Sequence, residues 1–195
     1  MVTISTDYPM SLSIDYPDRK LNRLTTFFRL LMVIPIAIIF ALLTNSSNYV
    51  ILPTILMILF LKKYPRWWFD WNLALTRFST RISAYIFLLR DEYPSTDEEQ
   101  AVHIDIPYPN VKEELNRWLP LVKWILAIPH CIVLYFLFIG VLIAVVIAWF
   151  AILFTGHYTK SLFDYIVGVL RWSLRVYVYA FLLTTDRYPP FRLSD

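Results

Sequence analysis

A pattern of three charged residues occurs twice in this chain, 94 positions apart. The pattern is an aspartate followed by arginines seven and eleven positions later: Asp70, Arg77 and Arg81, and then Asp164, Arg171 and Arg175. On a helix the three side chains of each set point to within about 40° of one another, because successive residues are about 100° apart. Aromatic and leucine residues around them match at the same offset. The chain is therefore an internal duplication, and each copy is expected to contain one amphipathic helix.

The composition is too apolar for a soluble domain of 195 residues. Hydrophobic residues make up 58% of the chain and the mean hydropathy is +0.54, whereas a soluble domain is nearer about half apolar. The first copy has apolar stretches at 27–43 and 49–61, and the second at 118–139 and 141–154. Since crossing a bilayer takes about 20 residues, we expect four transmembrane helices arranged as two hairpins.

The distribution of charge predicts the topology of these hairpins. Their turns, at 45–48 and near Gly140, carry no charge, while the lysines and arginines lie in the N-terminal segment, the connector, the amphipathic stretches, the tail and the end turns of the spans. Short loops rich in lysine and arginine stay in the cytoplasm. Both termini should therefore be cytoplasmic. Because each copy has an even number of spans, the two copies form a parallel repeat, inserted the same way up.

Two short stretches, 8–17 and 101–109, alternate apolar and polar residues next to prolines. This pattern predicts half-buried β-strands, which either pair with each other or each join the sheet edge of a partner. The predicted organisation is a first repeat at 1–92, a charged connector at 93–100 and a second repeat at 101–195. The predicted fold class is an all-α integral membrane protein with an amphipathic interfacial helix after each hairpin and short cytoplasmic strands.

The charged face of the two amphipathic helices has three interpretations. It can lie in water or among headgroups while the opposite face lies in lipid. Asp70 and Asp164 can instead form ion pairs with arginines that hold helices together. In the third interpretation the arginines bind lipid phosphates or an acidic partner, since guanidinium matches phosphate in a bidentate way. The candidate lipid- or partner-binding residues are Arg77, Arg81, Arg171, Arg175, Trp67, Trp68, Trp71 and Trp172.

The sequence contains no motif for catalysis or for binding a metal or cofactor. Three glycines are too few for a phosphate-binding loop or a dinucleotide fingerprint, and a single cysteine, Cys131, excludes a cysteine-based metal cluster. His130 stands within an apolar stretch without a second histidine or a carboxylate in any span. We expect it to be neutral and bonded to a backbone carbonyl freed by Pro129. No enzyme activity, cofactor, metal or nucleic-acid partner is expected.

Several short motifs of the second copy occur together in one known family. They are Leu153-Phe-Thr-Gly-His157, Ser161-Leu-Phe163, the pair Arg171 and Arg175, Tyr177-Val-Tyr179, and Asp186-Arg-Tyr-Pro-Pro-Phe191. With these motifs, about 115–192 resembles a prokaryotic membrane family described as domain of unknown function 4389, and the duplication extends the resemblance to the first copy. The resemblance implies a helical hairpin followed by an amphipathic helix, in a bacterial inner membrane, and implies no activity.

The first copy departs from the family pattern at one point. Leu61-Lys-Lys63 stands where the second copy has Thr155-Gly-His157. A special backbone role is therefore expected for Gly156 in the second copy only.

These observations favour a non-enzymatic function. We expect an accessory or scaffold subunit of a larger inner-membrane complex, in contact with membrane lipids and with other membrane subunits. The reasons are that the spans have very few polar residues, that catalytic motifs are absent, and that very little of the chain is predicted on the outer side of the membrane. The alternative is a lipid-binding protein, or a transporter of lipids or small molecules, whose basic face at the cytoplasmic interface binds anionic headgroups.

Overall fold

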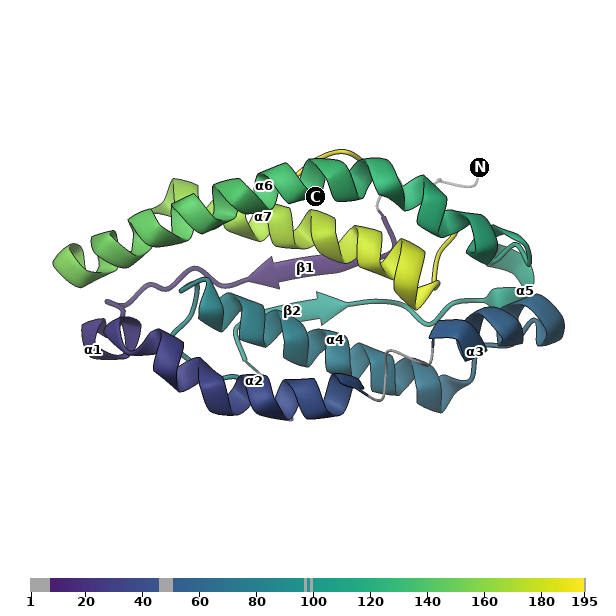
Figure 1. The fold of residues 1–195 in the computed structure, drawn as a ribbon, viewed down its shortest axis with the longest axis horizontal. Helices are drawn as coiled ribbons and strands as arrows, with labels where there is room; N and C mark the ends of the chain where they lie inside the picture. Colours follow the sequence, from purple (N-terminus) through teal and green to yellow (C-terminus); the bar gives the residue numbers. More distant parts are fainter. Residues whose placement is uncertain (1–7, 46–50, 97, 99, 195) are drawn as a thin grey trace.

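The computed structural model describes residues 8–45, 51–96, 98 and 100–194, and most of its helices run along one long axis (Figure 1). The first copy contains β1 (Ser11–Ile14), α1 (Arg23–Phe27), α2 (Arg29–Asn45), α3 (Ile51–Leu56), the π-helical turn η2 (Met57–Leu61) and α4 (Arg66–Ile86). The second contains β2 (Val102–Asp105), α5 (Val111–Glu114), α6 (Leu119–Thr155), α7 (Lys160–Tyr177) and the π-helical turn η3 (Val178–Leu182). In Figure 1, α6 and α7 lie on one side of the strands, and α4 and α2 lie on the other.

The two strands pair with each other in an antiparallel sheet. Leu12 lies opposite Ile104 and Ile14 opposite Val102, and all four side chains are buried in the main hydrophobic core. The residues between them are exposed, as the alternating pattern predicts. Pairing between the two copies is thus confirmed as one of the two predicted alternatives. Each strand is shorter than predicted because the predicted segments include prolines, which cannot donate to the ladder.

Four tyrosine hydroxyls join one copy to the other. Tyr16, just after β1, donates a hydrogen bond to the backbone carbonyl of Tyr158, and Tyr108, after β2, donates to that of Tyr64. Tyr64 and Tyr158 in turn donate to carbonyls near the ends of η3 and α4, at 3.0 and 3.1 Å. Burial raises the pKa of Tyr64 and of Tyr158, so both hydroxyls remain protonated donors. Each copy therefore supplies backbone carbonyls that accept hydrogen bonds from tyrosine hydroxyls of the other copy.

A single helix, α6, occupies the place where the sequence predicts the second hairpin. Its 37 residues run unbroken through Gly140, so the predicted turn there, and with it two separate spans at 118–139 and 141–154, is wrong. The glycine serves a close approach instead, because Tyr165 of α7 donates to the Leu137 carbonyl at 2.9 Å and a β-carbon on Gly140 would lie 2.4 Å from that hydroxyl. A single glycine lowers the stability of a helix by only about 1 kcal/mol. The long apolar sequence on both sides of Gly140 therefore continues as one helix.

The direction of the helices also bears on the predicted repeat. The turn predicted at 45–48 falls, apart from Asn45, outside the described residues. With α6 unbroken, the second copy lacks the hairpin predicted within 118–154, and α6 packs against α7 instead. In Figure 1, α2 and α6 run in opposite directions along the long axis. The two copies are thus related by a rotation about an axis across the helices, not along them.

Two helices in the described part of the chain are long and apolar enough to cross a membrane. They are Leu119–Thr155, which is α6, and Lys160–Leu182, which is α7 with η3. In the most apolar 18-residue stretch of α6, only 22% of the residues are buried inside the protein. In the corresponding stretch of α7 and η3, 72% are buried. The second helix therefore has the burial of a core helix, while α6 exposes apolar side chains. Within the described residues these are the two helices that meet the requirement, so the four predicted spans are not confirmed there.

The backbone at the end of α6 has a counterpart in the first copy. Gly156 ends α6 with a φ of 79°, and Lys62, at the equivalent position after η2, has a φ of 47°. Both residues are in the left-handed region, which costs a non-glycine residue about 1–2 kcal/mol. The role expected for Gly156 alone is therefore shared by both copies.

Candidate functional site

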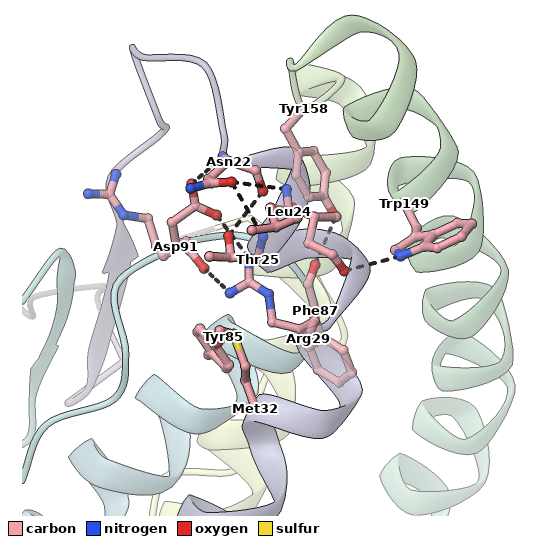
Figure 2. A network of polar contacts seen from close by, with 12 residues as sticks. Asn22, Leu24, Thr25, Arg29, Met32, Tyr85, Phe87, Asp91, Trp149 and Tyr158 are labelled. Atoms are coloured by element: carbon pink, nitrogen blue, oxygen red, sulfur yellow. Dashed lines mark hydrogen bonds and ion pairs between the residues drawn. The ribbon is translucent and has the colours of Figure 1, made fainter.

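A buried ion pair joins α2 to the segment that follows α4. The Arg29 side chain is 3% exposed and donates from Nη2 to Asp91 Oδ1 at 2.8 Å and from Nη1 to the Arg90 carbonyl at 2.9 Å. Its guanidinium lies 4.0 Å from the centre of the Tyr85 ring. Asp91 Oδ2 accepts the backbone N–H of Asn22 at 2.8 Å. Figure 2 shows Arg29 pointing from its helix toward the aspartate.

The second copy repeats this network with a lysine. Lys123 has no exposed side-chain surface, and its Nζ lies 2.8 Å from Asp186 Oδ1 and donates to the Thr185 carbonyl at 2.7 Å. The ammonium lies 5.1 Å from the centre of the Tyr179 ring. Asp186 Oδ2 accepts the backbone N–H of Asn116 at 2.6 Å. The same four kinds of contact thus occur in both networks, three made by the buried cation and one by its carboxylate partner.

The asparagine of each network also accepts the backbone N–H of the residue two positions later. Asn22 is thereby the N-cap of α1, whereas Asn116 lies three residues before α6, whose N-cap is Trp118. Asn22 Oδ1 accepts the N–H of Leu24 at 2.9 Å, and Asn116 Oδ1 accepts the N–H of Trp118 at 3.0 Å. A side-chain acceptor at a helix N-terminus satisfies a backbone donor that would otherwise have no partner. The backbone and the side chain of the asparagine therefore fix the carboxylate and the start of the segment together.

The sequence analysis assigned no role to Arg29 or to Lys123, which stands at the equivalent position of the second copy. Their acidic partners are far away in the sequence, at Asp91 and Asp186, and an ion pair at such a separation is visible only in the fold. A signal was nevertheless present, because each cation follows an asparagine by seven residues in both copies. Buried charges that keep their partners hold elements together, so we interpret both networks as structural.

Two of the predicted arginines bind the sheet. Arg171 donates from Nε and Nη2 to the Leu12 carbonyl at 3.2 and 3.1 Å, and Arg77 donates from Nη2 to the Ile104 carbonyl at 3.3 Å. Each strand therefore lies against the helix of the other copy. Carbonyls on the free edge of a strand are open to pairing with another chain, and these two are occupied by arginine.

The other two arginines bind the segments that follow the helices. Arg81 donates from Nη1 to the Ser95 carbonyl at 2.7 Å. Arg175 is buried and donates to the carbonyls of Arg192 and Ser194 at 3.2 and 2.8 Å. All four arginines thus hold backbone carbonyls of the protein itself, and whether they also bind lipid phosphates stays a prediction.

The two aspartates predicted to pair helices are exposed. Asp70 lies 4.0 Å from Arg66 Nε, and Asp164 lies 3.3 Å from Lys160 Nζ, each one helical turn along the same helix. Neither of these pairs bridges the two copies. Exposed pairs of this kind contribute only about 0.3–0.5 kcal/mol.

The four tryptophans of the predicted site separate into two kinds. Trp67 and Trp71 are 71% and 43% exposed. Trp68 and Trp172 are buried and donate from Nε1, to Thr54 Oγ1 at 2.8 Å and to His130 Nδ1 at 3.0 Å. Only the first two therefore present their rings on the surface, where a lipid or a partner can reach them.

His130 lies inside the protein between α6, α7 and the C-terminal tail. Its ring stacks on Phe191 with centroids 3.9 Å apart. The expected bond to a carbonyl freed by Pro129 is not formed, because Nδ1 accepts from Trp172 and buried Nε2 has no partner among the described residues. The aromatic tail residues and the tryptophan enclose the imidazole instead. In the part of the chain that the structure describes, no group of three or more His, Cys, Asp or Glu could hold a metal ion.

Together, the fold and these networks define a mostly helical protein built from two copies of one unit, with two helices that could cross a membrane. The chain belongs to the family described as domain of unknown function (DUF4389), whose profile matches residues 23–96 and 118–192. The two matched segments correspond to the two copies, which confirms the tandem duplication. No curated protein and no solved structure matches the chain.

Proposed function

We propose that this protein is a non-enzymatic accessory or scaffold subunit of a larger complex in the bacterial inner membrane. One observation carries the proposal, namely the apolar outer face of α6. Its exposed large apolar side chains extend along the helix and include Ile125, Ile128, Ile132, Phe136, Ile139, Ile143, Ile147, Phe150 and Phe154. Exposed apolar patches of this extent mark contact with lipid or with another protein.

The opposite side of the molecule offers a second surface of the same kind. Leu30, Leu31, Ile34, Ile38 and Leu42 of α2 are also exposed, and α2 and α6 are the outermost helices in Figure 1. Two apolar surfaces on one small protein suit a subunit that contacts lipid on one side and a neighbouring subunit on the other.

The interior supports a structural role. The buried cations, the four arginines and the tyrosine hydroxyls all donate to groups of the protein itself. These bonds fix the relative positions of the helices and the sheet. A rigid body with apolar outer helices is what a scaffold requires.

Affinity purification of the tagged protein from its native membranes in mild detergent tests the proposal. We expect other membrane subunits to co-purify in stoichiometric amounts. Substituting Phe136 and Ile143 together by alanine should release them if α6 is the contact, with Leu31 and Ile38 of α2 as the matched pair for the other surface. A subunit role would be contradicted if the protein purified without other subunits and neither pair of substitutions changed what co-purifies with it.

The alternative, a lipid-binding role for the basic face, is favoured by one residue. Arg77 is exposed, while its Nη2 donates to the Ile104 carbonyl. An exposed guanidinium can contact a phosphate at an interface. Native mass spectrometry should then show an anionic phospholipid that is lost in Arg77→Ala and retained in Arg66→Ala, an exposed arginine at the start of the same helix. Equal retention in both variants would remove the support for this alternative.

A further inference from the structure

A cavity of about 550 Å³ lies between the two copies. Its main walls are α4 and α7, and α2 and α3 contribute Phe40, Thr44 and Thr54. Sites for small molecules have volumes of about 300–1,000 Å³. None of the described residues that line the cavity carries a charge.

The two main walls consist of equivalent positions and yet differ in chemistry. The wall from α4 presents Thr76, Ser79, Thr80 and Ser83, which share one face of the helix. At the offset of 94 residues, the wall from α7 presents Leu170, Ser173, Leu174 and Tyr177. The duplication thus provides an internal comparison, in which two threonines of one copy face two leucines of the other across an open space.

The hydroxyls of α4 use their protons within their own helix. Thr76 donates to the Asn72 carbonyl at 2.7 Å and Thr80 to the Thr76 carbonyl at 2.8 Å, and the two serines donate likewise at 2.9 Å. A hydroxyl that has donated its proton retains lone pairs that can accept. This wall therefore presents acceptors to the cavity.

A row of serines and threonines on a helix can also serve to join two helices directly. Thr76 also forms a side-chain hydrogen bond with Tyr177 of α7, so one hydroxyl of the row does join the two helices. The bonds that Ser79, Thr80 and Ser83 donate stay within α4. Packing between helices therefore accounts for one of the four hydroxyls of the polar wall and leaves the other three facing the cavity.

We propose that this cavity binds an uncharged amphiphile with one aliphatic chain and a head group that donates hydrogen bonds, such as a monoacylglycerol. The head group donates to the hydroxyl oxygens of Thr76 and Thr80. The chain lies against Leu170, Leu174 and Phe181. A charged head group is excluded because the described lining offers no counter-charge, and a buried charge without one is costly.

The test compares three ligands that share one chain, on protein held in amphipol so that no detergent fills the cavity. Equilibrium dialysis is carried out with 1-decanoylglycerol, which donates hydrogen bonds, with methyl decanoate, which cannot donate, and with decanoate, which is charged. We expect 1-decanoylglycerol to bind at least about tenfold more tightly than either of the others, the ratio that about 1.4 kcal/mol produces. Equal affinity for the three would overturn the proposal without any variant.

Two sets of variants locate the binding. Thr76→Val with Thr80→Val preserves the shape and removes the acceptors, so the preference for 1-decanoylglycerol over methyl decanoate should vanish. Thr155→Val is the matched control, because Thr155 makes the same bond, to the Ala151 carbonyl at 2.7 Å, outside the cavity. Leu174→Thr, which places the residue of the first copy in the apolar wall, should weaken binding of methyl decanoate severalfold. A preference that survives the valine pair, or methyl decanoate binding that Leu174→Thr does not change, places the ligand elsewhere and refutes the proposal.

Discussion

At the scale of single residues, the two buried cations join the first long helix of each copy, α2 or α6, to the segment that follows the last helix of that copy. Arg29 divides its donors between a carboxylate and a carbonyl, while Lys123 does the same with one compact ammonium. Arginine and lysine differ in geometry, with a planar fork in one and a point charge in the other. Because each carboxylate also accepts a backbone N–H, removing it leaves two donors without a partner.

Replacing Asp91 by asparagine should destabilise the protein by about 3–5 kcal/mol, because the Arg29 guanidinium is then buried without its counter-charge. The matched change in the second copy, Asp186→Asn, should have a similar effect, since Lys123 is equally enclosed. The measurement is the free energy of unfolding in mixed micelles of mild and denaturing detergent.

The exposed aspartate Asp164 provides the control for both changes. Asp164→Asn should alter the free energy of unfolding by less than about 0.5 kcal/mol, because an exposed ion pair contributes little. If Asp91→Asn were as mild as this control, the buried pair would not stabilise the fold.

The tyrosines that join the copies predict a loss of stability at high pH. Burial raises the pKa of Tyr64 and Tyr158 above the ordinary value of 10.0. Their contribution is therefore complete below pH 10 and is lost as the pH rises toward the raised values, because the unfolded chain ionises first. Replacing both by phenylalanine should cost about 1 kcal/mol per hydrogen bond at pH 8 and make the decline above pH 10 shallower. An unchanged alkaline slope would mean that these hydroxyls ionise as freely in the folded protein.

At the scale of the elements, the contact between α6 and α7 depends on one missing side chain. Substituting alanine for glycine within a helix ordinarily stabilises it by about 0.5–1 kcal/mol. For Gly140→Ala we expect the opposite sign, a loss of about 1–3 kcal/mol, because the added methyl would lie 2.4 Å from the Tyr165 hydroxyl. Thermal unfolding of the purified variant measures the sign directly.

Tyr165→Phe supplies the second half of this comparison. Removing the hydroxyl removes the atom that the methyl would strike, so Gly140→Ala should be less harmful in the phenylalanine background than in the native one. Additive effects of the two substitutions would show that the helices are not held at this point.

The elements could be predicted from the sequence only in part. Alternation of apolar residues identified both strands, since burial of one face leaves a pattern with period two. The same reasoning failed for α6, because Gly140 lies within a long apolar stretch and the helix continues through it. A glycine that admits a tyrosine from another helix has the same sequence appearance as a glycine in a turn.

The candidate site shows the same division. The duplication singled out the four arginines, since charged residues repeated at the same spacing are visible in one dimension. Their partners are backbone carbonyls of the strands, the connector and the tail, which no side-chain pattern identifies. The polar and apolar walls of the cavity were equally hidden, because they meet only when α4 and α7 face each other.

At the scale of the whole molecule, the first and the last described residues, Tyr8 and Ser194, both form a hydrogen bond with Arg175. Tyr8 donates to the Arg175 carbonyl at 3.2 Å, and the Arg175 guanidinium donates to the Ser194 carbonyl at 2.8 Å. We therefore expect reporters fused to either end to lie on the same side of the membrane, and the distribution of lysine and arginine predicts the cytoplasmic side. Paired reporter fusions, one active in the cytoplasm and one outside it, measure this. Opposite locations of the two ends would contradict the prediction.

The exchanged strands have a consequence for the history of the protein. In each copy the strand packs against the other copy's helix, through Arg171 and Leu12 on one side and Arg77 and Ile104 on the other. A protein that contained only one copy could make these contacts only with a second molecule of the same protein. An ancestor with one copy would then have needed to form an intertwined homodimer, whose assembly depends on concentration, whereas in this chain both halves belong to one polypeptide.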